Sequence, residues 1–165
     1  GLAPAAHGGT RTGRVFTGDK SSDFLYKCLF NAKISNQSTS NHVNDGLKLK
    51  EAFITPALKC VPPEDKPLKI ELNNCSKFFN NELNILKNLK VVVALGKIAF
   101  DTCKIFYKDK FDVPKDFQFG HGKIYKLANG VKLVGCYHPS PRNVNTGRIN
   151  VKMMTDLFIK IKKLN

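Results

Sequence analysis

A run of five consecutive apolar residues, Val91–Leu95, constrains the fold of this 165-residue chain more than any other feature. No polar residue alternates with the apolar ones, which is typical of a parallel strand that is buried on both faces of its sheet. Gly96 ends the run, and apolar residues then recur at helical spacing: Ile98, Ala99, Ile105 and Phe106. A buried strand that leads directly into an amphipathic helix indicates an α/β domain.

Three further segments have the pattern of amphipathic helices. Ser21 and Ser22 are cap candidates for a helix that we expect over about residues 21–34. A long helix is predicted around residues 72–86, where apolar side chains recur at helical spacing. The chain closes with a third amphipathic helix around residues 153–164, with lysines on its outer side.

Two shorter patterns indicate strands. The Asn-Gly pair at 129–130 separates the runs 123–127 and 131–137, and Asn-Gly between two such runs is the strongest short hairpin signal. Residues 52–58 are another strand candidate. Pro56 interrupts this candidate, so we place it at a sheet edge or at the end of a strand.

The alternation of strands and helices favours a single domain over residues 1–165. We expect a three-layer α/β/α sandwich around a central, mostly parallel sheet. The polar segment 31–50 is rich in Ser, Thr and Asn and predicts a mobile excursion. Ligands bind such sheets at the carboxyl ends of the strands. Two unusual loops, 1–19 and 138–148, are expected at that edge.

The charge of the chain indicates a polyanionic partner. Lys and Arg number 27 against 13 Asp and Glu, which gives a formal net charge of +14. Nucleic acid would use such a field, although a general bias towards lysine would produce the same excess. A hydrophobic content of 42% excludes a disordered basic tail. No apolar run approaches the roughly 18 residues of a membrane span, so we expect a soluble protein.

The five cysteines do not form the pattern of a secreted disulfide framework, because their number is odd and the flanking segments resemble an ordinary core. Cys28, Cys103 and Cys136 have apolar neighbours and are expected to be buried. Cys60 differs, because a rigid Val-Pro-Pro turn follows it. The chain has no C-x-x-C pair, which weakens both a zinc-ribbon and a thioredoxin interpretation.

The two loops carry the candidate chemistry. Loop 1–19 contains five glycines, which let backbone amides approach a ligand closely, although a plain surface loop would have the same composition. It has neither the phosphate-loop nor the dinucleotide-binding pattern. Loop 138–148 places His138 at the end of an apolar strand, before a proline-stiffened, cationic turn. A lone histidine is more often structural, but this position favours a functional one.

Five motifs in order resemble the signatures of type-5 uracil-DNA glycosylases, the iron–sulfur "B" branch of the uracil-DNA glycosylase superfamily. They are residues 1–8 (GLAPAAHG), 11–19 (RTGRVFTGD), 59–63 (KCVPP), 93–99 (VALGKIA) and 138–148 (HPSPRNVNTGR). The resemblance implies a four-stranded sheet and a monofunctional hydrolase, which flips a deaminated base out of DNA and hydrolyses its N-glycosidic bond. It also implies a monomer that acts in the cytoplasm on double- and single-stranded DNA.

The resemblance assigns roles to individual residues. Phe16 matches the aromatic residue on which the extruded base stacks. His138 matches the histidine that donates to the base O2 and stabilises the departing pyrimidine. Residues 139–148 match the loop that enters the DNA where the base has left. The remaining base or DNA contacts implied by the resemblance are at Gly1, Ala3, His7, Pro56, Ser140, Arg142, Asn143 and Arg148.

The chain departs from better-known members of the superfamily at two places. Ala3 stands where those enzymes carry an aspartate that activates water, so Asp19 and Thr10 are the candidates for that task. Thr10 can orient a water but cannot act as a base, and Asp19 is equally suited to cap the following helix. Pro56 falls near the position where related enzymes carry an asparagine whose amide reads the uracil edge. The lack of this amide should broaden the substrates to uracil, hypoxanthine, xanthine and etheno-bases.

The resemblance also implies a 4Fe-4S cluster held by four cysteines. Cys60 and Cys75 match the third and fourth ligands, and the first pair would lie in a segment upstream of Gly1. Two other interpretations stay open. One is a basic nucleic-acid-binding module with this fold but little or no catalysis. The other is an unrelated nucleotide-binding α/β domain, which the lack of a phosphate-loop pattern disfavours.

Overall fold

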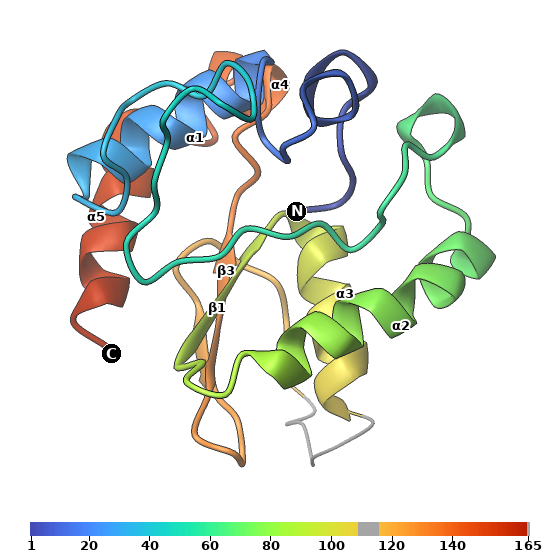
Figure 1. Cartoon of the computed structure of the whole chain (residues 1–165). Coiled ribbons are helices and arrows are strands. Elements are labelled where there is room, and N and C mark those ends of the chain that lie inside the picture. Colours follow the sequence, from blue (N-terminus) through green and yellow to red (C-terminus); the bar gives the residue numbers. More distant parts are fainter. Residues whose placement is uncertain (109–115, 165) are drawn as a thin grey trace.

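A three-stranded sheet forms the centre of the computed structural model, which describes residues 1–108 and 116–164. The strands are β1 (Val91–Leu95), β2 (Ile124–Lys126) and β3 (Lys132–Cys136), in the order β1-β3-β2 (Figure 1). β1 and β3 are parallel, and β2 pairs with β3 in the antiparallel direction. The strand expected at Val91–Leu95 is confirmed.

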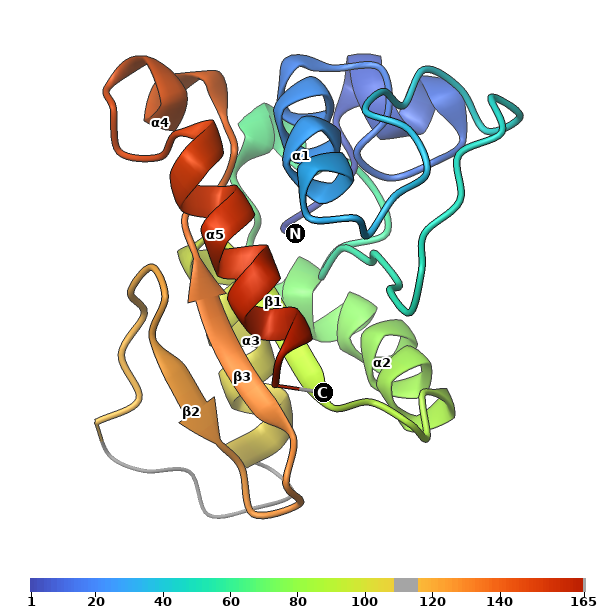
Figure 2. The same cartoon turned by 90° about the vertical axis from the view of Figure 1, so that its left-hand side faces the viewer.

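Helices cover both faces of the sheet. On one side, α1 (Lys20–Asn31) and α5 (Val151–Lys162) pack on each other and on the sheet (Figure 2). On the other side lies α3 (Lys97–Lys108), with α2 (Lys69–Ile85) beyond it. Successive residues of β3 point to opposite faces, so Val134 belongs to the α1/α5 core and Leu133 to the α3 core. The α/β/α architecture is therefore confirmed.

The sheet differs in detail from the expectation. Four mostly parallel strands were expected, and the described residues form three, of which one pair is parallel and one antiparallel. The strand expected at residues 52–58 is absent from the described sheet. Instead, the amides of Ala57 and Leu58 donate to the carbonyls of Gly1 and Leu2 at 2.9 and 2.8 Å. These bonds fix the start of the chain beside this segment.

The predicted hairpin is confirmed. Gly130, at φ +84°, closes the turn between β2 and β3, and the amide of Leu127 donates to the carbonyl of Val131. The helix expected over 21–34 forms as α1, but its N-cap is Asp19 and neither Ser21 nor Ser22. Asp19 Oδ1 accepts from the Ser22 amide at 2.8 Å, while Ser22 Oγ accepts from the Asp19 amide.

Three short helical turns complete the description: η1 (Ala6–Thr10), η2 (Pro63–Asp65) and α4 (Pro141–Asn145). Segment 31–50 is irregular, as expected, but a bridge between Ser35 and Leu49 closes it on itself, and Leu47 and Leu49 pack against the α1/α5 core. Ser40 in this segment is fully buried. Within the described ranges, no helix combines the length and the apolar character that crossing a membrane would require.

Candidate functional site

Three segments meet where β1 and β3 end. The glycine-rich loop 1–18 is bound to segment 53–61 through the Gly1 carbonyl and Ala57, and Gly96 and His138 follow the two strands. The amide of Gly96 donates to the carbonyl of Cys136 at 2.8 Å, which keeps the two strand ends together. The two loops singled out in the sequence therefore lie at the carboxyl edge of the parallel pair, as expected.

Phe16 and His138 come together at this edge. Their ring centroids are 5.7 Å apart with an interplanar angle of 33°. Gly1 lies against the Phe16 ring, because a Cβ built at Gly1 would be 2.8 Å from Phe16 Cε2. Gly96, at φ +99°, lies against His138, whose Cβ would be 3.4 Å from a Cβ at Gly96. The structure thus assembles an aromatic ring, an imidazole and two small backbone surfaces.

The backbone of Phe16 has an unusual conformation. Its φ is +52°, in the left-handed region that residues with a bulky side chain rarely adopt. Such strain concentrates at functional sites, where the surrounding structure imposes it. The residue is 8% exposed and belongs to the α1/α5 core.

The His138 imidazole is held in its neutral form. Burial lowers the pKa of His138 from 6.5 to about 4. At neutral pH the ring therefore has one N–H donor and one acceptor nitrogen. The side-chain amide of Asn143 donates to the His138 carbonyl at 2.9 Å, which ties the histidine to the loop that follows.

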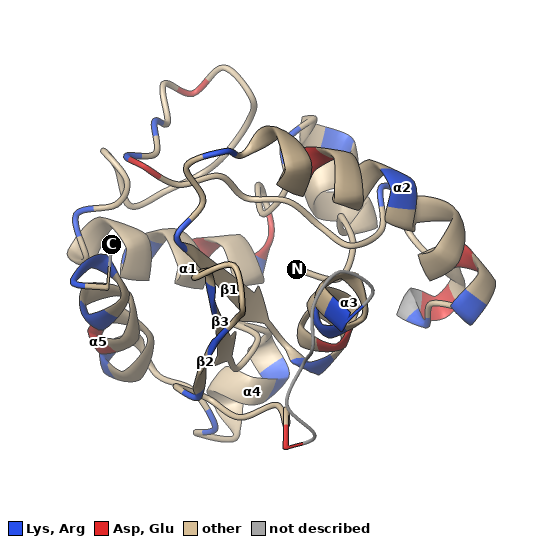
Figure 3. Cartoon of the chain, turned by 90° about the horizontal axis from the view of Figure 1, so that it is seen from below, with Lys and Arg blue, Asp and Glu red and all other residues tan. Residues whose placement is uncertain are grey.

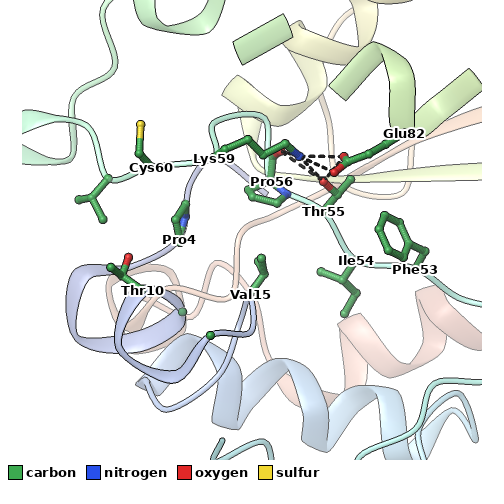
Figure 4. A pocket seen from close by; sticks show the side chains of 13 residues that line it. Pro4, Thr10, Val15, Phe53, Ile54, Thr55, Pro56, Lys59, Cys60 and Glu82 are labelled. Atoms are coloured by element: carbon green, nitrogen blue, oxygen red, sulfur yellow. Dashed lines mark hydrogen bonds and ion pairs between the residues drawn. The ribbon is translucent and has the colours of Figure 1, made fainter. Parts of the chain in front are cut away.

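A cavity of about 580 Å³ lies between loop 1–18 and segment 53–61; Val15, next to Phe16, lines it, whereas Phe16 and His138 do not. Figure 4 shows Thr10, Pro56 and Cys60 in its wall, so three of the predicted site residues share this cavity. Lys59 donates to both carboxylate oxygens of Glu82, at 2.9 and 2.7 Å, and to Thr55 Oγ1 at 2.8 Å. This half-buried ion pair ties the segment that carries Pro56 to α2.

Asp19 acts as the cap of α1, so the capping alternative is confirmed. Its second oxygen faces the glycine-rich loop, because a Cβ at Gly8 would lie 2.2 Å from Asp19 Oδ2. Only glycine leaves room for the carboxylate at this position. A role of Asp19 or Thr10 in activating water stays a prediction.

Loop 138–148 is built around α4. The Ser140 hydroxyl accepts from the Asn143 amide at 3.4 Å and caps this short helix. Arg142 is exposed on α4, whereas the Arg148 guanidinium lies 4.6 Å from the centre of the Tyr137 ring. The two arginines that were assigned the same DNA-binding role therefore differ in their surroundings.

The other predicted contacts occupy more open positions. Ala3 is half-buried, and His7 is exposed, with its carbonyl accepting from Arg11 Nε at 3.0 Å. Cys60 is exposed and Cys75 is half-buried, and both are free thiols. Across the described ranges, no three His, Cys, Asp or Glu side chains are grouped so as to hold a metal ion. These two cysteines alone are therefore an incomplete ligand set for a cluster of four irons.

Sequence reasoning missed several residues that shape the site. Gly96 and Tyr137 flank the functional positions on the two strands, and Lys59 and Glu82 anchor the cavity wall. Gly96 and Lys59 belong to two of the motifs described above, so the sequence already contained a signal that pointed to them. Glu82 lies on α2, 23 residues from Lys59, and only the folded chain brings them together.

Comparison with known proteins agrees with this geometry. The family described as "Uracil DNA glycosylase superfamily" matches residues 1–162. The type-5 uracil-DNA glycosylase of Mycobacterium tuberculosis is 42% identical over 165 residues, which cover 99% of this chain and 61% of that protein. That of Pyrobaculum aerophilum is 42% identical over 158 residues, or 96% of this chain and 67% of that protein.

The type-5 uracil-DNA glycosylase of Thermus thermophilus is 39% identical over 165 residues, covering 99% of this chain and 73% of that protein. The chain thus spans about three fifths to three quarters of the length of these relatives. Because these matches extend over nearly all of its residues, the chain belongs to the uracil-DNA glycosylase superfamily and, within it, to the type-5 uracil-DNA glycosylases.

Proposed function

We propose that this protein is a DNA glycosylase that extrudes uracil from DNA and hydrolyses its N-glycosidic bond, which starts base excision repair. The observation that carries the proposal is the pairing of the Phe16 ring with the neutral His138 imidazole at the carboxyl edge of the sheet. The names of the curated relatives support the same activity.

Phe16 and His138 act on different parts of the extruded nucleotide. The face of the Phe16 ring provides a stacking surface, and stacking of this kind contributes about 1–3 kcal/mol per base. The His138 N–H donates to the pyrimidine O2, where negative charge grows as the glycosidic bond breaks. A neutral imidazole suits this task, because it donates without transferring its proton to the leaving group.

The attacking water has its candidate position in the cavity between loop 1–18 and segment 53–61. Thr10 lines this cavity and is exposed, so its hydroxyl is free to orient a water. The methyl group of Ala3 provides neither a base nor a hydrogen bond. A glycosylase with a cationic, dissociating transition state needs only a weakly activated water, so positioning by Thr10 or Asp19 is sufficient.

The substrates extend beyond uracil in this proposal. Pro56 is buried in the cavity wall and has no amide N–H with which to read the polar edge of a base. A site without that donor rejects other bases only weakly. The cavity of about 580 Å³ has room for a purine, so we include hypoxanthine, xanthine and etheno-bases among the substrates.

DNA is the proposed partner, in double- and single-stranded form. Lys and Arg outnumber Asp and Glu by 27 to 13, and Figure 3 shows basic positions on α2, α3, α4 and α5. The α4 loop, with the exposed Arg142, enters the duplex in place of the extruded base. The protein is proposed to act on intracellular DNA as a monomer.

A 4Fe-4S cluster is proposed for the full-length protein. Cys60 and Cys75 would supply two of its four thiolate ligands, and the cluster would stabilise the fold, because hydrolysis needs no redox step. In the full-length protein, Cys60→Ser and Cys75→Ser should each lose iron and solubility, whereas Cys103→Ser should retain its iron. Unchanged iron content in both variants would exclude these cysteines as ligands.

Single-turnover release of free uracil from a labelled duplex tests the proposed function. The full-length protein in excess over the duplex should convert it to an abasic product that alkali cleaves. Tight binding without release of the base would instead favour the binding-module interpretation, which Ala3, Thr10 and Pro56 motivate.

A further inference from the structure

A buried polar network connects the residues around Phe16 to a distant part of the chain. Arg14 lies two residues before Phe16. Its guanidinium has three side-chain acceptors: Thr17 Oγ1 at 3.1 Å, Ser40 Oγ at 2.8 Å and Asp45 Oδ2 at 2.7 Å. Thr17 follows Phe16 directly, is fully buried, and has its hydroxyl 2.6 Å from that of Ser40. Arg14 and Thr17, which lie on either side of Phe16 in the sequence, are thus both bound to the Ser40 hydroxyl.

Asp45 is itself fixed by its own backbone neighbourhood. Its carboxylate accepts from the amides of Asn41, His42 and Leu47 at 2.7, 3.4 and 3.0 Å. Burial alone would raise the pKa of Asp45, but hydrogen bonds from Arg14 and from these amides hold it well below its ordinary value. The carboxylate is therefore charged at every pH at which the protein works.

The network surrounds a backbone that would not adopt its conformation unaided. Phe16 has φ +52°, and a bulky residue persists there only when its surroundings over-determine it. The amide of Gly18 adds a bond of 3.0 Å to the Ser40 carbonyl. On the inner side, the Thr12 hydroxyl lies within 3.3 Å of the Thr17 carbonyl. The two residues that follow Phe16 are therefore both bound to Ser40, and Thr17 is also bound to Thr12.

Arg14 is not placed to bind a DNA phosphate instead. Its side chain is 21% exposed and that of Asp45 is 7% exposed, so the pair is mostly shielded from solvent. Both the Nε and the Nη2 groups already have acceptors within the protein. Arg142, in contrast, is exposed on α4.

We propose that Arg14, Ser40 and Asp45 are positioning residues that hold Phe16 where the extruded base stacks. This inference rests on the proposed function for the identity of the stacked base. The segment that carries Ser40 and Asp45 would thereby contribute to catalysis without touching the substrate. A misplacement of about 1 Å in such a contact is enough to lower a rate by about 100-fold.

Three substitutions test whether the network positions Phe16, as distinct from an effect of its charge or of overall stability on the rate. Arg14→Lys keeps the positive charge but cannot hold three acceptors in a fixed fork. Asp45→Asn removes the partner charge. Ser40→Ala removes only one hydroxyl and serves if either of the first two variants unfolds. Asp101→Asn is the matched control, because it breaks the exposed ion pair with Lys97 on α3.

The first measurements are the single-turnover rate on uracil-containing duplex and the affinity for free uracil, both with the full-length protein. Arg14→Lys and Asp45→Asn should lower the rate by about 10- to 100-fold and weaken uracil binding by about tenfold. Asp101→Asn should change neither. The salt dependence of DNA binding should stay unchanged in Arg14→Lys, since no phosphate contact is lost.

A double-mutant cycle with Phe16→Leu distinguishes positioning of the Phe16 ring from a purely structural role of the network. In the Phe16→Leu background, Asp45→Asn should lower the rate by less than about twofold, because the stacking ring is already absent. If Asp45→Asn lowers the rate equally in both backgrounds, or leaves it unchanged in the wild type, the positioning role is wrong.

Nuclear magnetic resonance keeps this test independent of the proposed activity. Cross-relaxation between the Phe16 and His138 ring protons should be present in the wild type and in Asp101→Asn, and lost in Arg14→Lys and Ser40→Ala. Retention of these contacts in the two network variants would overturn the inference. A wild-type protein that shows the contacts but releases no base would instead overturn the proposed function alone.

Discussion

The Asn143 side-chain amide donates to the backbone carbonyl of His138 at 2.9 Å, and so joins the predicted catalytic histidine to the loop that is expected to enter DNA. The bond closes a turn over residues 138–143, within which Ser140 also caps α4. In the proposed function, binding of this loop to DNA would therefore be coupled to the position of the imidazole.

Replacement of Asn143 by Ala should thus affect both functions of this loop. We expect the single-turnover rate on uracil to fall by about tenfold, with a smaller loss of affinity for abasic DNA, because a neutral hydrogen bond contributes about 0.5–1.5 kcal/mol. Asn145→Ala, in the same helix, is the control. Equal rates for the two variants would show that the bond to His138 does not position the ring.

The pH dependence of the rate tests the protonation state of His138. Because burial lowers its pKa from 6.5 to about 4, the imidazole is neutral over the whole range from pH 5 to 8. The single-turnover rate should therefore show no loss through His138 as the pH rises across this range. A rate that falls about tenfold per pH unit above pH 6.5 would show that the imidazolium is the active form.

The same pKa shift predicts an effect on stability. A histidine whose folded-state pKa is lowered binds fewer protons in the native state than in the unfolded chain, so stability declines as the pH falls from about 6.5 towards 4. His138→Gln should lose less stability than the wild type over this interval, as measured by urea denaturation. Parallel curves for the two proteins would contradict the assigned pKa.

Arg142 and Arg148 should respond differently to substitution by Ala. Loss of the exposed Arg142 should lower the slope of log affinity against log salt by about one unit, as for a lost phosphate contact. Arg148 lies over Tyr137, and a cation–π contact of this kind contributes about 0.5–1 kcal/mol at an exposed site. Arg148→Ala should therefore mainly lower thermal stability. If Arg148→Ala lowers the salt slope and Arg142→Ala lowers only thermal stability, Arg148 and not Arg142 contacts the phosphate.

Pro56→Asn should narrow the substrate range. The new amide can hydrogen-bond the polar edge of uracil but leaves an unpaired donor beside other bases. We expect the ratio of single-turnover rates for uracil over hypoxanthine to rise by about tenfold or more. A ratio that does not change would mean that Pro56 does not face the base.

Local patterns predicted much of the fold, and distant contacts explain the rest. Val91–Leu95 and the Asn129-Gly130 hairpin are encoded by consecutive residues, so their prediction did not require a tertiary structure. Segment 52–58 has strand-like composition, yet its amides bind Gly1 and Leu2, about 55 residues away, in place of a sheet strand. No local pattern indicates that partner.

The candidate site shows the same division. Phe16 and His138 lie in recognisable motifs, and the structure brings them together, but Asp45 lies 31 residues from Arg14 in a segment without a motif. Asp19 shows a third case, in which a residue suited to two roles was resolved as a helix cap by its bond to Ser22. The separation of 31 residues between Arg14 and Asp45 is bridged only in the folded chain.

His138→Ala is the decisive variant for the proposal that His138 stabilises the departing base. The variant should lower the single-turnover rate on uracil by about 10²–10³-fold, the effect typical of losing one oxyanion-type donor. Binding to a non-cleavable uracil analogue should change far less, because the contact strengthens mainly in the transition state. A near-normal rate, or a loss of binding and thermal stability without a specific loss of rate, would contradict the account.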